Sequence, residues 1–236
     1  MRSRGTPVTT GSIRGLVPDI DRVTTGLLAL RRELPDARIH ISTRSLPNAS
    51  AIRAVDAFGA SFAVASRAEI DALERHGVAI AGCLHTRPVR TVADITGAYL
   101  RGIRAFVVDS ADEIEKFQEL PDAAALVLLS ARRPGRRDAG ALVERCLRVG
   151  LRVAGFRIRT GGEAASARDI RRALALMRRL ERTRGIRFDT LDLGGGLPVA
   201  PDRLGAEVAG RARGIRAALA HAPSRYRILV EAGYAD

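Results

Sequence analysis

The run "TLDLGGG" over residues 190–196 ends in three consecutive glycines, Gly194, Gly195 and Gly196, which have the backbone freedom to hold an anion. Backbone without side chains can come close to a phosphate and donate its N–H groups to it. The alternative interpretation is a tight turn whose glycines serve packing alone. The glycine run therefore predicts an anion site only if positively charged groups lie close to it.

The cysteines and histidines do not predict a metal site. Cys83 and Cys146 are the only two cysteines and neither belongs to a C-x-x-C or Cys/His cluster, so we expect two reduced thiols in the core. The four histidines are scattered along the sequence: His40, His76, His85 and His221. A zinc site is disfavoured because zinc ligands normally cluster at short spacings.

The net charge of +13 raises the question of nucleic-acid binding, which basic proteins achieve by neutralising phosphates. Aromatic residues make up only 4% of the chain, and no basic block alternates with stacking aromatic residues. Lys116 is the only lysine, so the charge comes from arginines spread through an alanine-rich sequence. Nucleic-acid binding stays an alternative and is disfavoured.

The overall composition indicates a cytoplasmic protein. Hydrophobic residues make up 46% and charged residues 28%, as in ordinary globular domains. No run approaches the roughly 18 apolar residues of a membrane span, and the N-terminus lacks the apolar core of a signal peptide. We therefore expect no membrane partner.

Short apolar runs rich in β-forming residues alternate with segments of helical periodicity, which indicates βα units. Runs that are apolar throughout, such as "ALVLL", indicate strands covered on both faces, as in parallel sheets. The predicted strands are residues 37–43, 61–66, 78–83, 105–110, 125–131, 153–160, 190–196 and 226–233.

Helix start signals support the segments between these strands. Ser66 with Glu69, and Ser110 with Glu113, match the S-x-x-E capping box and predict firm helices after the second and fourth strands. Two longer helices are predicted to bury one face each: residues 166–185, with Ile170, Leu174 and Met177, and residues 19–36, with Val23, Leu27 and Leu30.

Eight strands with helices between them, and one helix in front that completes the ring, predict a single (β/α)8 barrel of the TIM type. The length of 236 residues fits this fold, which needs about 250. We expect residues 1–18 to be an N-terminal extension and residues 19–236 to be the barrel. At the carboxyl ends of the strands, where barrel sites form, positive charge would favour an anionic ligand. The arginines expected there are Arg44, Arg87, Arg90 and Arg159.

Three segments, in this order and spacing, carry a resemblance to a known family. "GASFAVASRAEIDALERHGV" is similar to G-x-G-F-D-V-A-S-x-x-E-I, "GIRAFVVDSADEIEKF" follows it, and "FDTLDLGGGLP" is similar to L-D-I-G-G-G-F-P. From Asp19 to Tyr234 the chain resembles the fold-type III pyridoxal-phosphate enzymes, specifically the ornithine/diaminopimelate/arginine decarboxylase family. The resemblance implies an alanine racemase-like barrel that carries pyridoxal phosphate. In the family a C-terminal β domain completes the active site at a dimer interface, and we expect that domain to be lacking here.

The family's first barrel strand reads Y-A-V-K-A-N-P-N-P, and its lysine holds the cofactor as a Schiff base. The matching stretch here is "ISTRSLPNA", so Arg44 occupies the Schiff-base lysine position. A Schiff base needs a neutral, nucleophilic amine, whereas a guanidinium stays protonated and delocalised. Lys116 is not expected to substitute, because it lies within the predicted helix after the fourth strand rather than at a strand end.

Other matched positions depart from the family in the same direction. Ala63 stands where the family has an aspartate, Leu129 where it has an active-site arginine, and Arg159 where a histidine stacks on the pyridine ring. The family's E-P-G-R element, which binds the ring nitrogen and phosphate, reads "EAGY" here. The cofactor-binding set implied by the resemblance is Arg159, Gly162, Gly194, Gly195, Gly196, Glu231, Gly233 and Tyr234.

These departures predict a degenerate, catalytically inactive barrel, a pseudoenzyme with no catalytic residue and with an anion-binding mouth. Pyridoxal phosphate would be held non-covalently at most, or not at all. The alternatives are an amino-acid decarboxylase completed by another chain and a basic nucleic-acid-binding protein. The expected partners are a small anionic ligand and either a second copy of the chain or a complete homologue.

Overall fold

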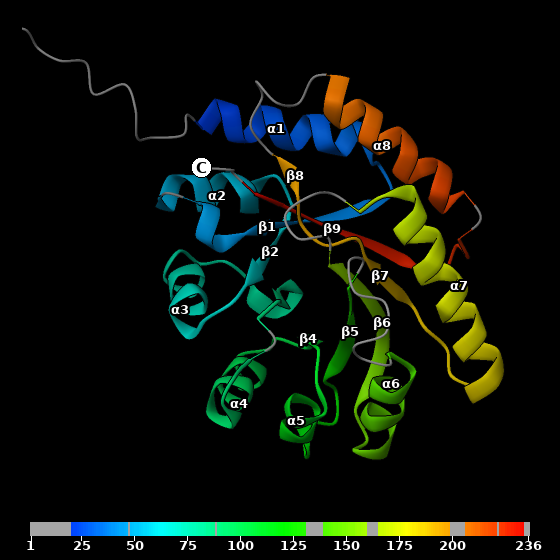
Figure 1. The fold of residues 1–236 in the computed structure, drawn as a ribbon. Helices are drawn as coiled ribbons and strands as arrows, with labels where there is room; N and C mark the ends of the chain where they lie inside the picture. The colour runs from blue at the N-terminus through cyan, green and yellow to red at the C-terminus, as the bar shows by residue number, and fades with distance from the viewer. Residues whose placement is uncertain are drawn as a thin grey trace, which may run out of the picture.

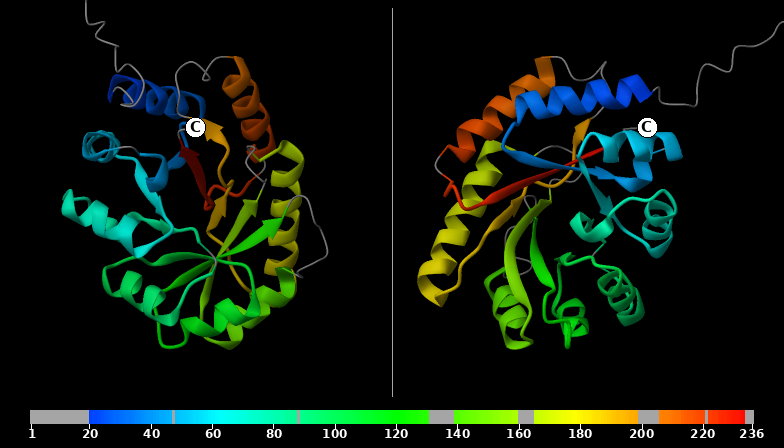
Figure 2. Two further views of the ribbon diagram at one scale, coloured as in Figure 1. Left: turned by 60° about the vertical axis from the view of Figure 1, so that its left-hand side comes forward. Right: turned by 180° about the vertical axis from the view of Figure 1, so that it is seen from behind.

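The computed structural model describes residues 20–46, 48–87, 89–130, 139–159, 165–198, 206–220 and 222–233. Eight parallel strands form a closed barrel with helices around its outside (Figure 1; Figure 2). The barrel strands are β1 (Ala37–Ser42), β2 (Ser61–Val64), β3 (Leu84–His85), β4 (Ala105–Val108), β5 (Ala124–Ser130), β6 (Arg152–Arg159), β7 (Thr190–Asp192) and β9 (Arg227–Gly233). Strand β9 pairs with β1 from Ala37↔Ile228 to Ile41↔Ala232, which closes the ring and confirms the predicted (β/α)8 fold. A short further strand, β8 (Leu197–Pro198), pairs with the end of β9.

The helices surround the barrel, as Figure 2 shows from two sides. They are α1 (Ile20–Glu33), α2 (Ala49–Ala57), α3 (Arg67–Arg75), α4 (Val92–Leu100), α5 (Ala111–Ile114), α6 (Ala139–Arg148), α7 (Ala167–Arg184) and α8 (Ala206–Leu219). Three 3₁₀ turns interrupt the connections: η1 (Thr43–Ser45), η2 (Ile80–Gly82) and η3 (Glu115–Phe117). Helix α1 lies beside α8, so the helix predicted in front of the first strand completes the outer ring (Figure 1). In the described part of the chain, no helix has both the length and the apolar character that crossing a membrane requires.

Side-chain caps define where two of the predicted helices begin. Ser66 Oγ accepts a hydrogen bond from Glu69 N at 3.3 Å, and Glu69 Oε2 accepts one from Ala65 N at 2.7 Å. Helix α7 begins with a full capping box between Ser166 and Asp169. Each cap satisfies N–H groups that the first helical turn leaves without a partner, so the start of the helix is set locally.

The prediction of a third strand at residues 78–83 was wrong. Ile80–Gly82 is a 3₁₀ turn, and β3 comprises only Leu84–His85. Val78, Ile80 and Cys83 are buried, but in irregular backbone rather than in a strand. A short apolar run indicates that its residues are buried, but it does not indicate which backbone conformation they adopt. The apolar pattern therefore predicted the third strand at the wrong residues.

The predicted cap at Ser110 was also wrong. The Ser110 side chain makes no capping hydrogen bond, and the helix after β4 is short, with α5 ending at Ile114 and continuing as η3. Glu113 does not reach back to the helix start, because its carboxylate forms a buried ion pair with Arg90. The ion pair with Arg90 therefore uses the Glu113 side chain that the sequence pattern assigned to the helix cap.

Strand alternation divides the side chains between two cores. Outward-facing side chains pack under the helices, and this core includes the predicted residues Val23, Leu27 and Leu30 of α1 and Ile170, Leu174 and Met177 of α7. Inward-facing apolar side chains fill one part of the barrel interior: Leu84, Val107, Ala124, Leu126, Ala154 and Leu229. The rest of the interior, along β1, β6, β7 and β9, carries polar side chains, and these lie next to the predicted anion site.

Candidate functional site

The glycine run forms the turn that leaves β7 at the carboxyl end of the barrel. Gly194 and Gly196 have φ angles of 73° and 97°, a left-handed conformation that glycine adopts without steric cost. A Cβ on Gly194 would lie 2.2 Å from the carbonyl oxygen of Ile158, so only glycine fits there. A Cβ on Gly195 would meet nothing within 4 Å, so the middle of the turn borders open space.

Hydrogen bonds on both sides hold this turn in place. Gly194 N donates to Asp192 Oδ1 at 2.8 Å, and Gly194 O accepts from Glu231 N at 3.0 Å. The N–H group of Gly194 is therefore committed to Asp192. An anion at the turn would have to be met by the N–H groups of Gly195 and Gly196.

A buried ion triad, Arg157 with Asp192 and Glu231, lies in the barrel interior beside the turn. Arg157 donates from Nη1 to Asp192 Oδ2 at 2.5 Å and from Nη2 to Glu231 Oε2. The side chains of Arg157, Asp192 and Glu231 are 12%, 1% and 16% exposed. Burial opposes the charge of Arg157, but the two carboxylates outweigh that effect and raise the pKa of its guanidinium. One buried cation is therefore shared by two anions.

Close approach of β6 to β7 positions this triad. Gly155 is paired with Thr190, and a Cβ at Gly155 would lie 1.7 Å from the carbonyl oxygen of Thr190. Two residues further along the same ladder, Arg157 is paired with Asp192. Because parallel neighbours in register point to the same face, the two charged side chains meet inside the barrel.

His40 adds a fourth polar side chain to this part of the interior. It is paired with Glu231 in the β1–β9 ladder, and it is 5% exposed. Its Nδ1 has no hydrogen-bond partner among the described residues. Burial lowers the pKa of His40, although the carboxylates of Asp192 and Glu231 act in the opposite direction. His40 is therefore a neutral, buried histidine beside the triad.

Arg44 lies at the carboxyl end of the barrel, in the middle of η1, and its side chain is exposed. The η1 turn directly follows β1 and packs against the end of β9, since a Cβ on Gly233 would lie 3.3 Å from Ser45 Oγ. Arg44, Gly233 and the glycine turn after β7 are thus at the same end of the barrel.

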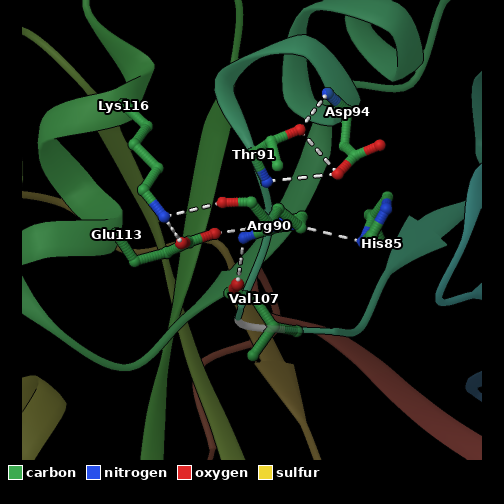
Figure 3. Close-up of polar contacts among 7 residues, drawn as sticks. All are labelled: His85, Arg90, Thr91, Asp94, Val107, Glu113 and Lys116. Carbon is green, nitrogen blue, oxygen red and sulfur yellow. Dashed lines mark hydrogen bonds and ion pairs between the residues drawn. The ribbon is translucent and has the colours of Figure 1, made fainter.

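Arg90 does not add charge to the mouth, contrary to the prediction. Its side chain is 1% exposed, and its guanidinium meets His85, Val107 and Glu113 (Figure 3). Arg90 Nε donates to Glu113 Oε1 at 2.7 Å, and Nη2 donates to Val107 O at 2.7 Å. The rings of Phe106 and Phe117 lie 5.4 and 5.3 Å from its guanidinium carbon. Arg90 is therefore bound by a buried carboxylate and by two aromatic rings, and these contacts stabilise the fold.

Lys116 belongs to the same cluster (Figure 3). Its Nζ donates to Arg90 O at 2.6 Å and to Glu113 Oε2 at 2.9 Å, so Glu113 is shared by two cations. His85 Nδ1 lies 3.2 Å from Arg90 Nη1, and burial, followed by the charge of Arg90, lowers the pKa of His85 to about 3. The cluster joins the segment after β3 to α5 and η3, away from the glycine turn.

Several other positions matched to the family lie within strands or beyond the described residues. Ala63 is buried in β2, where it pairs with Ser42 and Leu84, and Leu129 packs against the outer core from β5. Arg87 is exposed after β3, and Arg159 ends β6, with its side chain outside the described part of the chain. The residues of the implied set that lie outside the described ranges are Gly162 and Tyr234.

Both cysteines are free and buried, as predicted, and burial raises the pKa of each thiol to about 12. Across the ranges that the structure describes, no group of three or more His, Cys, Asp or Glu side chains could hold a metal ion.

The interior residues Arg157, Asp192 and His40 were not predicted as site residues from the sequence. A signal for them existed in the strand alternation, because His40 lies between the apolar Ile39 and Ile41, and Arg157 lies between Phe156 and Ile158. Such an isolated polar residue in a two-sided apolar strand indicates an inward-facing position that needs a partner.

Residues 20–134 match the family model "Pyridoxal-dependent decarboxylase, pyridoxal binding domain". The chain is 29% identical over 209 residues to the lysine/ornithine decarboxylase of Selenomonas ruminantium, covering 82% of this chain and 53% of that protein. It is 28% identical over 227 residues to the diaminopimelate decarboxylase of Actinosynnema pretiosum subsp. auranticum, covering 86% and 52%. The chain spans about half the length of these curated relatives.

Solved structures extend the likeness over nearly the whole chain. The crystal structure of lysine/ornithine decarboxylase from Vibrio vulnificus, complexed with cadaverine, matches with a TM-score of 0.82 at 29% identity, covering 92% of this chain and 60% of that one. The family match, the relatives and the closed parallel barrel agree with one another. In sequence and in fold, the chain therefore resembles the barrel domain of the ornithine, lysine and arginine decarboxylase family.

Proposed function

We propose that this barrel has lost the Schiff-base chemistry of its family and is a catalytically inactive domain that binds a small phosphate-bearing anion at its mouth. The observation that carries the proposal is Arg44, exposed at the end of β1 in the position that the resemblance gives to the Schiff-base lysine. Imine formation needs an amine that can lose its proton and attack a carbonyl carbon. A guanidinium, which stays protonated and delocalised in proteins, does neither.

Lys116 does not supply the missing amine. It is the only lysine in the chain, and its ammonium is bound by the Glu113 carboxylate and the Arg90 carbonyl outside β4. These contacts hold its ammonium away from the glycine turn at the carboxyl end of the barrel. The residues present therefore do not fit pyridoxal phosphate held through a covalent bond, and we assign no catalytic step to that cofactor.

The mouth retains groups that suit a phosphate. Gly195 borders open space at the end of β7, and Arg44 adds positive charge at the end of β1. Backbone N–H groups and arginine side chains are the usual partners of phosphate oxygens. By resemblance, the other positions that would surround the ligand are Arg159, Gly162, Gly196, Gly233 and Tyr234.

A second candidate is an amino-acid decarboxylase that another polypeptide completes. It is supported by the 29% identity over 209 residues to the lysine/ornithine decarboxylase of Selenomonas ruminantium. In that case the second polypeptide would have to supply a reactive amine as well as the remaining catalytic groups.

Reductive trapping tests the proposal. The protein is incubated with equimolar pyridoxal phosphate, reduced with borohydride and digested, and modified peptides are identified by mass spectrometry. We expect no pyridoxyl group within the barrel and no release of CO₂ from ornithine, lysine, arginine or diaminopimelate. A stoichiometric label on Lys116, or CO₂ release by the chain alone, would contradict the loss of catalysis. CO₂ release that appears only with a co-expressed homologue would favour the second candidate.

The variant Arg44→Lys tests the position itself, because it returns an amine to the mouth without changing the charge. We expect the variant to gain a pyridoxyl label at residue 44. Arg38→Lys is the matched control, since Arg38 is also exposed on β1 but lies near the opposite end of the strand. Equal labelling of the two variants would mean that residue 44 is an ordinary surface position.

A further inference from the structure

We infer that Arg157 closes the barrel interior to a pyridine ring, so that a ligand binds at the mouth through its phosphate group and any ring stays outside the interior. This inference rests on the proposed function and deepens it, because it names the class of ligand that the anion-binding mouth takes. Asp192 and Glu231 are the two carboxylates of the triad beside the glycine turn.

Both carboxylates already have partners. Arg157 Nη1 bonds to Asp192 Oδ2 at 2.5 Å, and the other oxygen of Asp192 accepts from Gly194 N at 2.8 Å. Arg157 Nη2 bonds to Glu231 Oε2. A planar guanidinium that holds two carboxylates through separate N–H groups is oriented by both, so moving it away from one disturbs its bond to the other.

A pyridine ring in the interior would need one of these carboxylates, because a buried ring nitrogen keeps its proton only when an anion accepts its hydrogen bond. For Glu231 to accept a hydrogen bond from a ring nitrogen, Arg157 would first have to break its own hydrogen bond to Glu231. Separating one partner from a buried ion pair is strongly unfavourable, because an uncompensated charge stays in the interior. His40, the neighbour of Glu231, is neutral and cannot balance a pyridinium charge.

The charge of the triad also keeps a phosphate at the turn. One cation and two anions give the triad a net negative charge, which repels a phosphate from the space beside Asp192 and Glu231. Positive charge and open backbone lie instead at the strand ends, at Arg44 and Gly195. The ligand class is therefore inorganic phosphate or a phosphate monoester whose remaining part points out of the barrel.

Thermal unfolding with two ligands separates the ring from the phosphate. Pyridoxine 5′-phosphate carries the ring but no aldehyde, and it is compared with inorganic phosphate at matched ionic strength. For the unmodified protein we expect equal shifts in Tm, with dissociation constants within about twofold of each other. In Arg157→Gln the released Glu231 should bind the ring. Pyridoxine 5′-phosphate should then bind about tenfold more tightly than phosphate, as expected for one added hydrogen bond to a charged group.

Arg152→Gln is the matched control. Arg152 is on the same strand, but its ion pair with Asp189 joins side chains that are 53% and 38% exposed. We expect this variant to keep the ligand ratio of the unmodified protein. A tenfold change in both variants would overturn the inference, because it would show a general effect of charge removal.

A second variant, Glu231→Gln, covers the case in which Arg157→Gln does not fold. It keeps an oxygen that can accept from Arg157, and it should leave the ligand ratio unchanged. Tighter binding of pyridoxine 5′-phosphate than of phosphate by the unmodified protein, abolished in Glu231→Gln, would overturn the inference and leave the proposed function standing. If neither ligand shifts the Tm of the unmodified protein, the proposed function fails. Arg157→Gln then decides the inference, since a gained response to pyridoxine 5′-phosphate supports it and no gain overturns it.

Discussion

Arg157 on β6 and Asp192 on β7 occupy paired positions of the barrel ladder, and their side chains meet at 2.5 Å. The same guanidinium reaches Glu231 on β9, so one cation links three strands. Asp192 in turn accepts the N–H of Gly194, which connects the buried charges to the turn at the mouth. Changes to the triad should therefore affect both the stability of the barrel and the geometry of the mouth.

Replacing Arg157 with alanine should lower the free energy of unfolding by about 3–5 kcal/mol, because the buried Asp192 and the partly buried Glu231 lose their cation. Arg152→Ala should cost about 1 kcal/mol or less, because its pair with Asp189 is exposed and screened by solvent. Urea titrations of both variants measure the two losses. Losses of similar size would show that the triad stabilises the protein no more than an exposed ion pair does.

Stability should fall as the pH drops below 6.5, because of His85. Burial, followed by the charge of Arg90, lowers the pKa of His85 from 6.5 to about 3. The unfolded chain therefore takes up a proton that the folded chain does not, so this contribution is fully present above pH 6.5 and is lost as the pH falls towards 3. His40, whose pKa is also lowered by burial, acts in the same direction.

Urea unfolding at about pH 7.5 and about pH 5 measures this dependence. The variant His85→Gln should lose less stability between the two pH values than the unmodified protein. His76→Gln, at the end of α3, serves as the control and should keep the original dependence. An unchanged dependence in His85→Gln would show that His85 does not contribute.

Gly194→Ala should destabilise the barrel by about 2 kcal/mol or more, because a left-handed φ and a clash with the Ile158 carbonyl are both imposed on the new side chain. Gly195→Ala should cost less than about 1 kcal/mol, because no atom lies within 4 Å of the added Cβ. The difference in Tm between the two variants measures the contrast. Equal effects would mean that Gly194 does not lie against the Ile158 carbonyl in a left-handed conformation.

Gly195→Val should abolish the rise in Tm that phosphate produces, because a branched side chain fills the open space through which an anion reaches the backbone. The variant should fold, since the position is not left-handed and has room for a side chain. Arg171→Gln, on the exposed face of α7, should leave the shift intact. If both variants respond alike, phosphate binds diffuse surface charge, whose effect also disappears in salt.

The barrel could be predicted from the sequence because its signals are local. Apolar runs mark the buried strands, the cap at Ser66 marks a helix start, and the spacing of Ile170, Leu174 and Met177 marks a buried helix face. The exceptions are also local in origin: residues 78–83 are apolar and buried, but burial alone does not distinguish a strand from a 3₁₀ turn.

The partners of the buried charges were decided only by the tertiary structure. Arg90 and Arg157 look alike in the sequence, yet Arg90 pairs with Glu113, 23 residues away, and Arg157 pairs with Glu231, 74 residues away. The interaction energy of two charges depends on their distance in space and on the low dielectric between them. Spacing along the chain determines that distance only within a single helix or strand, whereas strand register and barrel closure determine it everywhere else.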